Sequence, residues 1–388
     1  MASSSPSAPL PDAEPAVAPA APPLLGGSPV GTKLQRLTDM RELFRLAFER
    51  HASDIHLTEH APPLLRIHGD LQPTAMMPLT RAETKRLIYS ILTDQQRAQF
   101  ERDLELDMSI DVEGLGRFRV NVHLQRGSVE AALRLVASRI PSLQELGLPA
   151  IAAELARKPN GLVLVTGPTG SGKTTTLAAM VNLINHERSH HIILIEDPIE
   201  YVHTNVRSII KQREVYSDTK SFANALMRAL RQDPNIVVVG EMRDLDTIST
   251  TLTAAETGHL VLATLHTSDT MQTVNRIVDV FPASQQNQVR VQLSLELLGV
   301  VSQQLIPKAD GRGRVLATEF LMVNHAVRSL IREQKIHQIY SVIQTGQKEG
   351  MRTMNQTLYE LYTQRVITLE NALGRSGDPD DLMRLMNR

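Results

Sequence analysis

Short apolar runs alternate with amphipathic segments over the second half of the chain. Four of these runs have the length and β-branched composition of strands, at residues 161–166, 191–196, 236–240 and 260–265. The segments between them have apolar residues at helical spacing. Strands that alternate with helices form a parallel sheet wound by helices on both faces. This part of the chain is therefore predicted to have an α/β fold.

Beyond residue 284 the apolar positions follow a helical period only. The residues that fall on one helical face there are Val289, Leu293, Leu297, Val300 and Val301. The stretches 325–343 and 353–362 repeat this spacing. We therefore expect the chain to end in a helical region.

The first half of the chain has a different pattern, in which one helix precedes several short strands. Apolar residues have helical spacing over residues 34–49, and strand patterns follow at 54–57, 64–67, 107–112, 117–124 and 130–136. The sequence thus predicts a small α+β domain at 34–140, a linker at 141–150 and an α/β domain with C-terminal helices at 151–388. Residues 1–33 are rich in proline and alanine and are expected to be a disordered tail, either a spacer or a docking segment.

Composition narrows the class of protein. The 388 residues are 42% hydrophobic and 21% charged, and no apolar stretch approaches the ~18 residues of a membrane-spanning helix. The absence of cysteine excludes disulfides, thiolate catalysis and cysteine-bound zinc. A net charge of −1 and 3% aromatic residues offer little to nucleic acid. The N-terminus lacks the pattern of a secretory signal, so a cytoplasmic protein is expected.

A phosphate-binding loop follows the first strand of the α/β part. Residues 167–174 read GPTGSGKT and match G-x-x-x-x-G-K-[ST] between an apolar strand and an amphipathic helix. The residues expected to contact the nucleotide are Gly167, Pro168, Thr169, Gly170, Ser171, Gly172, Lys173, Thr174 and Thr175. Their backbone N–H groups and the helix N-terminus suit the phosphates of ATP. Lys173 is expected to reach the β- and γ-phosphates, and the Thr174 hydroxyl to bind Mg²⁺.

Two further strands end in acids. The run at 236–239 is followed by Gly240 and Glu241, so Glu241 is predicted to lie on the metal side of the site and to meet Mg²⁺ partly through water. The strand at 191–196 runs into Glu196, Asp197 and Glu200, and such crowding is costly unless a cation or a reacting group lies there. One of these acids is a candidate for the base that activates water. A solvated acidic turn is the alternative.

Histidines and arginines supply the other candidates. His259 and His266 stand at the two ends of the strand at 260–265, and His266 is at the end expected to face the nucleotide. His259 is as well explained by a structural hydrogen bond. Arg117, Arg119 and Arg134 lie on neighbouring predicted strands of the small domain. Arginines that reach across from another domain or subunit would complete the phosphate site, whereas ordinary surface charge is the alternative.

Four motifs in this order resemble the secretion-type ATPase superfamily. They are GPTGSGKTTT at 167–176, IEDPIEY at 195–201, VVVGEMRD at 237–244 and GHLVLATLHT at 258–267. Further stretches are similar to the type IV pilus retraction ATPases within it: SDIHL at 53–57, GRFRVN at 116–121, RIVDVFP at 276–282 and SVIQTGQKEGMRTMNQTL at 341–358. The resemblance covers roughly residues 34–365.

The resemblance implies a RecA-like P-loop core, a PAS-like N-terminal domain and a homohexameric ring that hydrolyses ATP with Mg²⁺. By the same resemblance Glu200 is the general base, Glu241 acts on the magnesium side, and Arg119 and Arg134 reach the phosphates. The implied partners are an inner-membrane pilus platform protein and a paralogous retraction ATPase, with the ring peripheral to the inner membrane at the pilus base.

The chain departs from the family pattern at two places. The helical motif AIRNLI, which the family links to retraction, reads AVRSLI at 326–331, with Val327 and Ser329 changed. The stretch SQRL reads SQQL, with Gln304 in place of arginine. Three alternatives stay open: a pilus assembly or type II secretion ATPase, which usually carries a four-cysteine zinc site; a nucleic-acid translocase, which would need a basic channel; and a scaffold that binds ATP without cleaving it.

Overall fold

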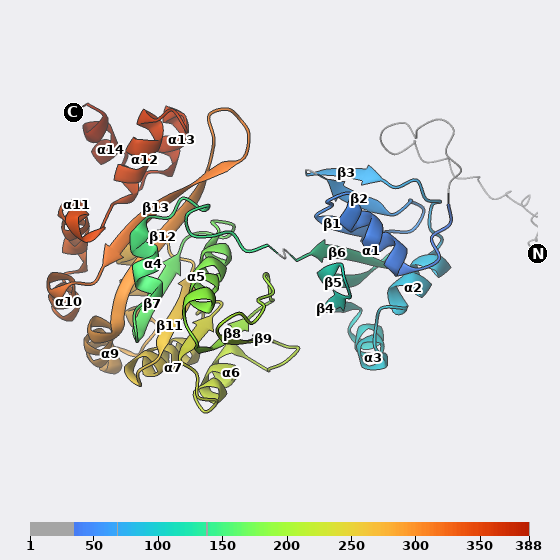
Figure 1. Ribbon diagram of the computed structural model, residues 1–388, viewed down its shortest axis with the longest axis horizontal. Coiled ribbons are helices and arrows are strands. Elements are labelled where there is room, and N and C mark those ends of the chain that lie inside the picture. The colour runs from blue at the N-terminus through green and yellow to red at the C-terminus, as the bar shows by residue number, and fades with distance from the viewer. Residues whose placement is uncertain (1–34, 68, 137–138, 388) are drawn as a thin grey trace, which may run out of the picture.

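The computed structural model describes residues 35–67, 69–136 and 139–387. Within these residues, two β-sheets with separate hydrophobic cores form the small N-terminal part and the larger C-terminal part (Figure 1). The predicted proline-rich tail, at residues 1–33, lies outside the described residues. The predicted α+β pattern followed by an α/β pattern is therefore confirmed for the described part of the chain.

The small sheet has six strands in the order β3-β2-β1-β6-β5-β4, and every pairing is antiparallel. The strands are β1 (Asp54–Leu57), β2 (Leu64–Ile67), β3 (Asp70–Pro73), β4 (Glu105–Val112), β5 (Gly116–Gln125) and β6 (Ser128–Leu135). The helices are α1 (Met40–Glu49), α2 (Arg81–Tyr89) and α3 (Asp94–Asp103). The first predicted helix thus begins at Met40 rather than at residue 34, and Asp39 caps it through the N–H of Arg41.

Side chains alternate along β5 between the two faces of the small sheet. Phe118, Val120 and Val122 are buried in the core that the helices cover, and Phe118 stacks on Phe44 of α1. Arg119 and Asn121 lie between them and therefore point to the opposite face. The sheet thus presents a polar face on the side away from its helices.

The large sheet has seven strands in the order β13-β12-β7-β11-β10-β8-β9. The strands are β7 (Gly161–Thr166), β8 (His191–Glu196), β9 (Ile209–Glu214), β10 (Ile236–Val239), β11 (Leu260–Leu265), β12 (Leu297–Pro307) and β13 (Arg314–Met322). All pairings are parallel except that of β12 with β13. All residues of β7 and β11 are buried, as strands covered on both faces require.

Helices cover both faces of this sheet. They are α4 (Ala150–Ala156), α5 (Lys173–Glu187), α6 (Phe222–Ala229), α7 (Leu245–Glu256), α8 (Thr270–Asp279) and α9 (Ala283–Glu296). The C-terminal elements are α10 (His325–Arg332), η1 (Ile336–Gln338), α11 (Ile339–Thr345), η2 (Gln347–Glu349), α12 (Met354–Thr363), α13 (Leu369–Arg375) and α14 (Pro379–Met386). The apolar faces of α4 and α5 share one core cluster, and those of α6, α7, α8 and α9 share another. The sheet therefore separates two layers of helices.

The predicted helix through Val301 is wrong in its second half. Helix α9 ends at Glu296, and Leu297, Val300 and Val301 belong to strand β12, which inserts between β7 and β13. Leu297, Val300 and Val301 are fully buried there. A run that is buried on both faces carries no period of its own, so the helical spacing upstream was extended too far.

Helix α10 carries the AVRSLI stretch. Val327 and Ile331 are buried and Leu330 packs against the same core, as the helical spacing predicts. Arg328 and Ser329 are half-buried. Helix α10 packs against α9, and the Arg328 charge acts on Glu296 of α9, so Arg328 is less exposed than a position off the apolar face of an isolated helix.

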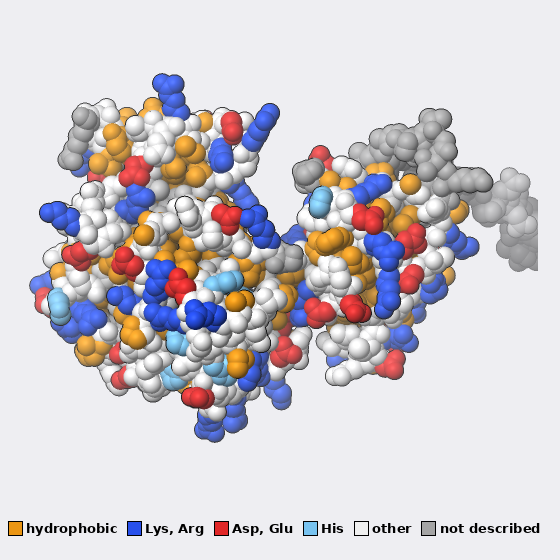
Figure 2. All heavy atoms as spheres, viewed as in Figure 1, with side chains coloured by type: hydrophobic (Ala, Val, Ile, Leu, Met, Phe, Trp, Pro, Cys, Tyr) orange, Lys and Arg blue, Asp and Glu red, His pale blue; other side chains and the backbone are white. Residues whose placement is uncertain are grey.

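In Figure 2, Lys and Arg side chains are interspersed with Asp and Glu on the face shown. Within residues 35–67, 69–136 and 139–387, no helix has both the length and the apolar character that crossing a membrane requires.

Candidate active site

The carboxyl ends of β7, β8, β10 and β11 meet at one edge of the large sheet. Because these four strands are parallel neighbours, the loops that leave them converge at that edge, where α/β sheets bind ligands. These loops contain the phosphate loop, the acidic turn at residues 196–200, Glu241 and His266. The structure thus brings together, in one cavity, motifs that are up to about 100 residues apart in the sequence.

The phosphate loop has backbone angles that only glycine adopts easily. Gly167, Gly170 and Gly172 have φ values of 142°, 76° and 90°. A Cβ atom at Gly167 would lie 2.3 Å from the backbone oxygen of Gln303, so β12 packs directly against the loop. Gly172 precedes α5 and brings no side chain that could cap the first N–H groups of that helix. These N–H groups are therefore available to an anion.

Lys173 is buried at the mouth of the loop. Its Nζ donates to the backbone oxygens of Gly167 at 2.8 Å and Pro168 at 3.0 Å. Burial lowers the pKa of Lys173, and the charges of Glu241 and Glu200 act in the opposite direction. The ammonium group is thus held by neutral carbonyls, which phosphate oxygens can replace with a stronger, charge-assisted contact.

The acidic turn holds three carboxyl groups in different surroundings. Glu196 is buried, its Oε2 accepts a hydrogen bond from Nε2 of Gln212 at 2.8 Å, and burial raises its pKa to about 7. Partial burial raises the pKa of Asp197, and the nearby Glu241 carboxylate adds to this effect. Glu200 is exposed and lines the same cavity. The turn therefore presents two solvent-accessible carboxyl groups, those of Asp197 and Glu200, next to a buried acid.

Glu241 follows β10 after Gly240 and lines the phosphate-loop cavity. Its Oε2 is 3.2 Å from Nε2 of His266, and its Oε1 is 2.7 Å from Nη2 of Arg243. His259, at the other end of β11, instead contacts the backbone oxygen of Ala254 through Nδ1 at 3.0 Å, which is a structural hydrogen bond. The two histidines therefore occupy different environments, and only His266 lies at the site.

A cavity of about 380 Å³ joins these groups. Its lining includes Lys173, Thr174, Thr175, Glu200, Glu241 and His266. Thr174 and Glu241 offer a hydroxyl and a carboxylate, and such oxygen donors suit Mg²⁺, which is bound through one or two protein groups together with phosphate. The donor set thus fits a magnesium ion that arrives with a nucleotide.

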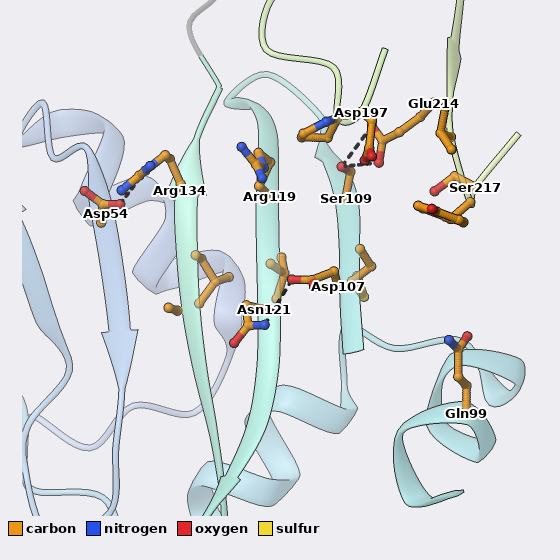
Figure 3. A pocket seen from close by; sticks show the side chains of 17 residues that line it. Asp54, Gln99, Asp107, Ser109, Arg119, Asn121, Arg134, Asp197, Glu214 and Ser217 are labelled. Carbon is orange, nitrogen blue, oxygen red and sulfur yellow. Dashed lines mark hydrogen bonds and ion pairs between the residues drawn. The ribbon is translucent and has the colours of Figure 1, made fainter. Parts of the chain in front are cut away.

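Arg119 and Arg134 line a different cavity of about 530 Å³ (Figure 3). They are direct cross-strand neighbours on β5 and β6, and Nε of Arg134 is 2.7 Å from Oδ1 of Asp54. Of the acidic turn, Asp197 and Pro198 line both cavities. Within this chain, then, the arginines lie beside the acidic turn and are not among the residues that line the phosphate-loop cavity.

Some residues at the site were not predicted. Leu305 and Arg314 line the phosphate-loop cavity from β12 and β13, and the Tyr201 hydroxyl is 3.0 Å from Oγ1 of Thr175. Gln212 of β9 donates both to Glu196 and to the backbone oxygen of Tyr201, at 2.7 Å. Tyr201 is the last residue of the IEDPIEY motif, so the sequence could have indicated it. Arg314 and Gln212 lie on strands that the apolar pattern had not indicated.

Fold and site together define a P-loop ATPase. Comparison with known sequences agrees, since the family described as type II/IV secretion system protein matches residues 33–374. The chain is 47% identical to the type IV pilus retraction ATPase PilT of Pseudomonas aeruginosa, over 88% of this chain and 99% of that protein. It is 49% identical to a twitching motility protein of Neisseria gonorrhoeae, over 82% of this chain and 86% of that protein.

Solved structures lead to the same family. The structure of a pilus retraction motor PilT with bound ADP superposes with a TM-score of 0.85 at 52% identity, covering 90% of this chain and all of that one. This protein therefore belongs to the type II/IV secretion system protein family and is a nucleotide-binding, ATP-hydrolysing enzyme of the PilT type. The predicted RecA-like ATPase core is confirmed.

Proposed function

We propose that this protein is a hexameric motor that hydrolyses ATP to retract type IV pili. The observation that carries the proposal is the convergence of the phosphate loop, Glu200, Glu241 and His266 in one cavity, in a chain that matches PilT over almost the whole of that protein. Retraction corresponds to disassembly of the pilus and supports twitching motility. The proposed division of the chain is a tail at 1–33, a PAS-like domain at 34–140, a linker at 141–150 and the ATPase domain at 151–388.

The proposed roles follow from the surroundings of each residue. Lys173 exchanges its carbonyl contacts for phosphate oxygens, and the N–H groups of the loop and of α5 hold the same phosphates. Glu200, an accessible carboxylate of the acidic turn, orients the attacking water and accepts its proton. Thr174 and Glu241 hold Mg²⁺, partly through water, and His266 keeps Glu241 in place at 3.2 Å. The bound ion neutralises charge on the phosphates.

The proposed partners include further copies of the same chain. Arg119 and Arg134 face a cavity other than the one that contains Lys173, so they reach a phosphate only after the small domain moves or from a neighbouring subunit. A ring supplies that neighbour. The other proposed partners are an inner-membrane pilus platform protein and a paralogous retraction ATPase, and the proposed location is the cytoplasmic side of the inner membrane at the pilus base.

The cellular experiment is deletion of the gene, scored for surface pili and for twitching. We expect surplus pili and no movement, and restoration of movement by the wild-type gene but not by Glu200→Gln. Loss of pili would instead assign the protein to assembly. Normal pili and normal movement would show that the protein does not act on type IV pili.

The enzymatic experiment compares Glu200→Gln with Glu241→Gln. Glu200→Gln is expected to bind ATP with unchanged affinity and to hydrolyse it at least ~100-fold more slowly, the scale of a lost general base. Glu241→Gln is expected to raise the magnesium concentration needed for binding as well. Full turnover by Glu200→Gln would move the base to another acid of the turn.

A further inference from the structure

A buried carboxylate connects the small domain with the acidic turn. Glu214, the last residue of β9, has a side chain that is only 6% exposed. Its Oε2 accepts a hydrogen bond from Nη2 of Arg117 at 3.0 Å, and its Oε1 accepts one from Oγ of Ser109 at 3.0 Å. Figure 3 shows the Ser109 side chain pointing at the Glu214 carboxylate, with dashed lines for the hydrogen bonds between them. Arg117 and Ser109 belong to strands β5 and β4 of the small sheet, so these contacts cross between the two parts of the chain.

The same carboxylate also holds the turn that carries Glu200. Oε2 of Glu214 accepts the backbone N–H of Ile199 at 3.3 Å, and Ile199 is the residue directly before Glu200. The backbone around Glu214 is itself fixed. The N–H of Val215 donates to the backbone oxygen of Glu196 at 2.9 Å, and the N–H of Glu214 donates to Oδ2 of Asp218 at 2.8 Å. The Glu214 carboxylate is therefore held in place, and it contacts the small domain on one side and the acidic turn on the other.

The strength of the hydrogen bond between Glu214 and Ile199 depends on the position of the small domain. A buried carboxylate is stable when it is paired and hydrogen-bonded, and it is costly when a partner is removed. If the small domain moves away, Glu214 loses Arg117 and Ser109 together and gains water in their place. The contact with Ile199 then competes with hydration. Arg117 is oriented by Asp111, whose Oδ2 lies 3.0 Å from its Nη1, so the guanidinium moves with the small sheet.

We propose that Glu214 is a positioning residue through which Arg117 and Ser109 of the small domain hold the Glu200 turn in its hydrolytic position. Hydrolysis is then fast only while the small domain is seated on the ATPase domain. This inference rests on the role of Glu200 as the base, and it adds to that role a dependence on domain position. Arg117 and Glu214 act on the turnover step, since neither lines the cavity around Lys173 and Thr174.

The test uses the full-length assembled enzyme with Arg117→Ala, Glu214→Gln and the milder Ser109→Ala. The first two are expected to lower kcat roughly 10- to 100-fold, the range for a misplaced catalytic group, while KM for ATP stays within about 2-fold. Ser109→Ala removes one hydrogen bond from an uncharged donor to the carboxylate and leaves the ion pair with Arg117 in place, so it is expected to lower kcat by only about 2- to 5-fold. Arg117→Lys keeps the charge and is expected to recover part of kcat.

A matched control is Arg102→Ala, which removes an exposed ion pair with Asp103 in the same domain and is expected to leave both constants unchanged. Thermal melting and gel filtration of every variant separate a loss of fold or of assembly from a loss of turnover. If Arg117→Ala reduces assembly, Ser109→Ala carries the test. Unchanged kcat in Ser109→Ala and Arg117→Ala, or equal changes in kcat and KM, overturn the proposal.

A second arm separates this inference from the assignment of the base. Arg117→Ala is introduced into Glu200→Gln, and residual turnover is compared with that of Glu200→Gln alone. If Arg117 acts through Glu200, the second substitution has little further effect. If it slows the enzyme by the same factor as in the wild type, the positioning role fails while the base remains. If Glu200→Gln itself turns over normally, the assigned base fails.

Discussion

At the scale of single residues, the acidic turn separates two carboxyl groups by their surroundings. Glu196 is buried at the end of β8, accepts a hydrogen bond from Gln212 and has a pKa raised to about 7 by burial, whereas Glu200 is exposed at the cavity. Pairs of acids whose surroundings differ in this way take different roles. Glu196 has the surroundings of a buried structural acid that binds its proton tightly, and Glu200 those of a group that reacts with water.

The buried acid leads to a prediction about stability and pH. Because the pKa of Glu196 is about 7 in the folded protein and 4.5 ordinarily, the folded state binds the proton more tightly. The stability that this gives is present below pH 4.5 and is lost as pH rises through 7. Glu196→Gln keeps the acceptor for Gln212 and is expected to remove this loss. We expect the variant to gain stability relative to wild type between pH 4.5 and 7, by on the order of 3 kcal/mol or less.

The measurement is urea unfolding followed by circular dichroism at pH 5, 6, 7 and 8. Exposed Glu154 of α4 provides the control, since Glu154→Gln removes a carboxylate from the same domain without touching the site. A difference between Glu196→Gln and wild type that stays constant with pH would contradict the assignment of a buried, protonated acid.

At the scale of elements, the apolar pattern predicted the buried parallel strands best. Residues 161–166, 191–196 and 260–265 coincide with β7, β8 and β11, because fully buried strands are continuous apolar runs bounded by turns. Strands β3 and β9 lie at the sheet edges and are partly polar, so no run indicated them. Strand β12 was assigned to a helix because its apolar residues continued the spacing of α9.

The same distinction explains what could be predicted of the candidate site. The phosphate loop, the acidic turn, Glu241 and His266 follow directly from predicted strands, and parallel strands bring their ends together. Arg314 comes from the antiparallel hairpin of β12 and β13, and Gln212 from the edge strand β9. The positions of Arg314 and Gln212 at the site depend on strand pairings between distant segments, and the local apolar pattern does not encode such pairings.

A prediction at the scale of elements concerns the role of helix α10 in pilus retraction. Val327 and Ile331 anchor it, and Arg328 lies close enough to Glu296 of α9 to oppose the upward pKa shift that burial gives that carboxyl. The helix can therefore act as a packed element or transmit force to a partner. Arg328→Ala and Ser329→Ala leave the anchors in place, and no large cavity is expected. We expect hexamers with normal ATP turnover that no longer retract pili in cells.

The matched control is Arg332→Ala, one turn further along the same helix and exposed. It removes a charge without changing the AVRSLI stretch and is expected to retract normally. Retraction by the Arg328 and Ser329 variants would place the coupling elsewhere. Loss of turnover and of assembly in them would make the helix structural.

At the scale of the whole molecule, two cavities meet at Asp197 and Pro198. One contains Lys173 and Thr174, and the other contains Arg119 and Arg134. A phosphate held by the loop needs cations opposite it as charge redistributes during transfer. Since the described chain keeps the arginines in the second cavity, the active site is completed either by a neighbour, which leaves the contacts of Glu214 with the small domain intact, or by a movement of the small domain within one subunit.

Mixed rings distinguish these two routes. Lys173→Ala lacks the phosphate contact but supplies both arginines, whereas the double variant Arg119→Ala with Arg134→Ala keeps the loop and lacks the arginines. Each alone is expected to be nearly inactive, with kcat rather than KM affected in the arginine variant.

If the arginines act on a neighbouring subunit, random rings from coexpression of the two variants regain turnover, at most about a quarter of the wild-type value because only that fraction of interfaces is intact. If they act within their own subunit, every subunit of a mixed ring is defective and turnover stays at the level of the separate variants. Wild-type kinetics in the arginine variant by itself would reduce both residues to surface charge.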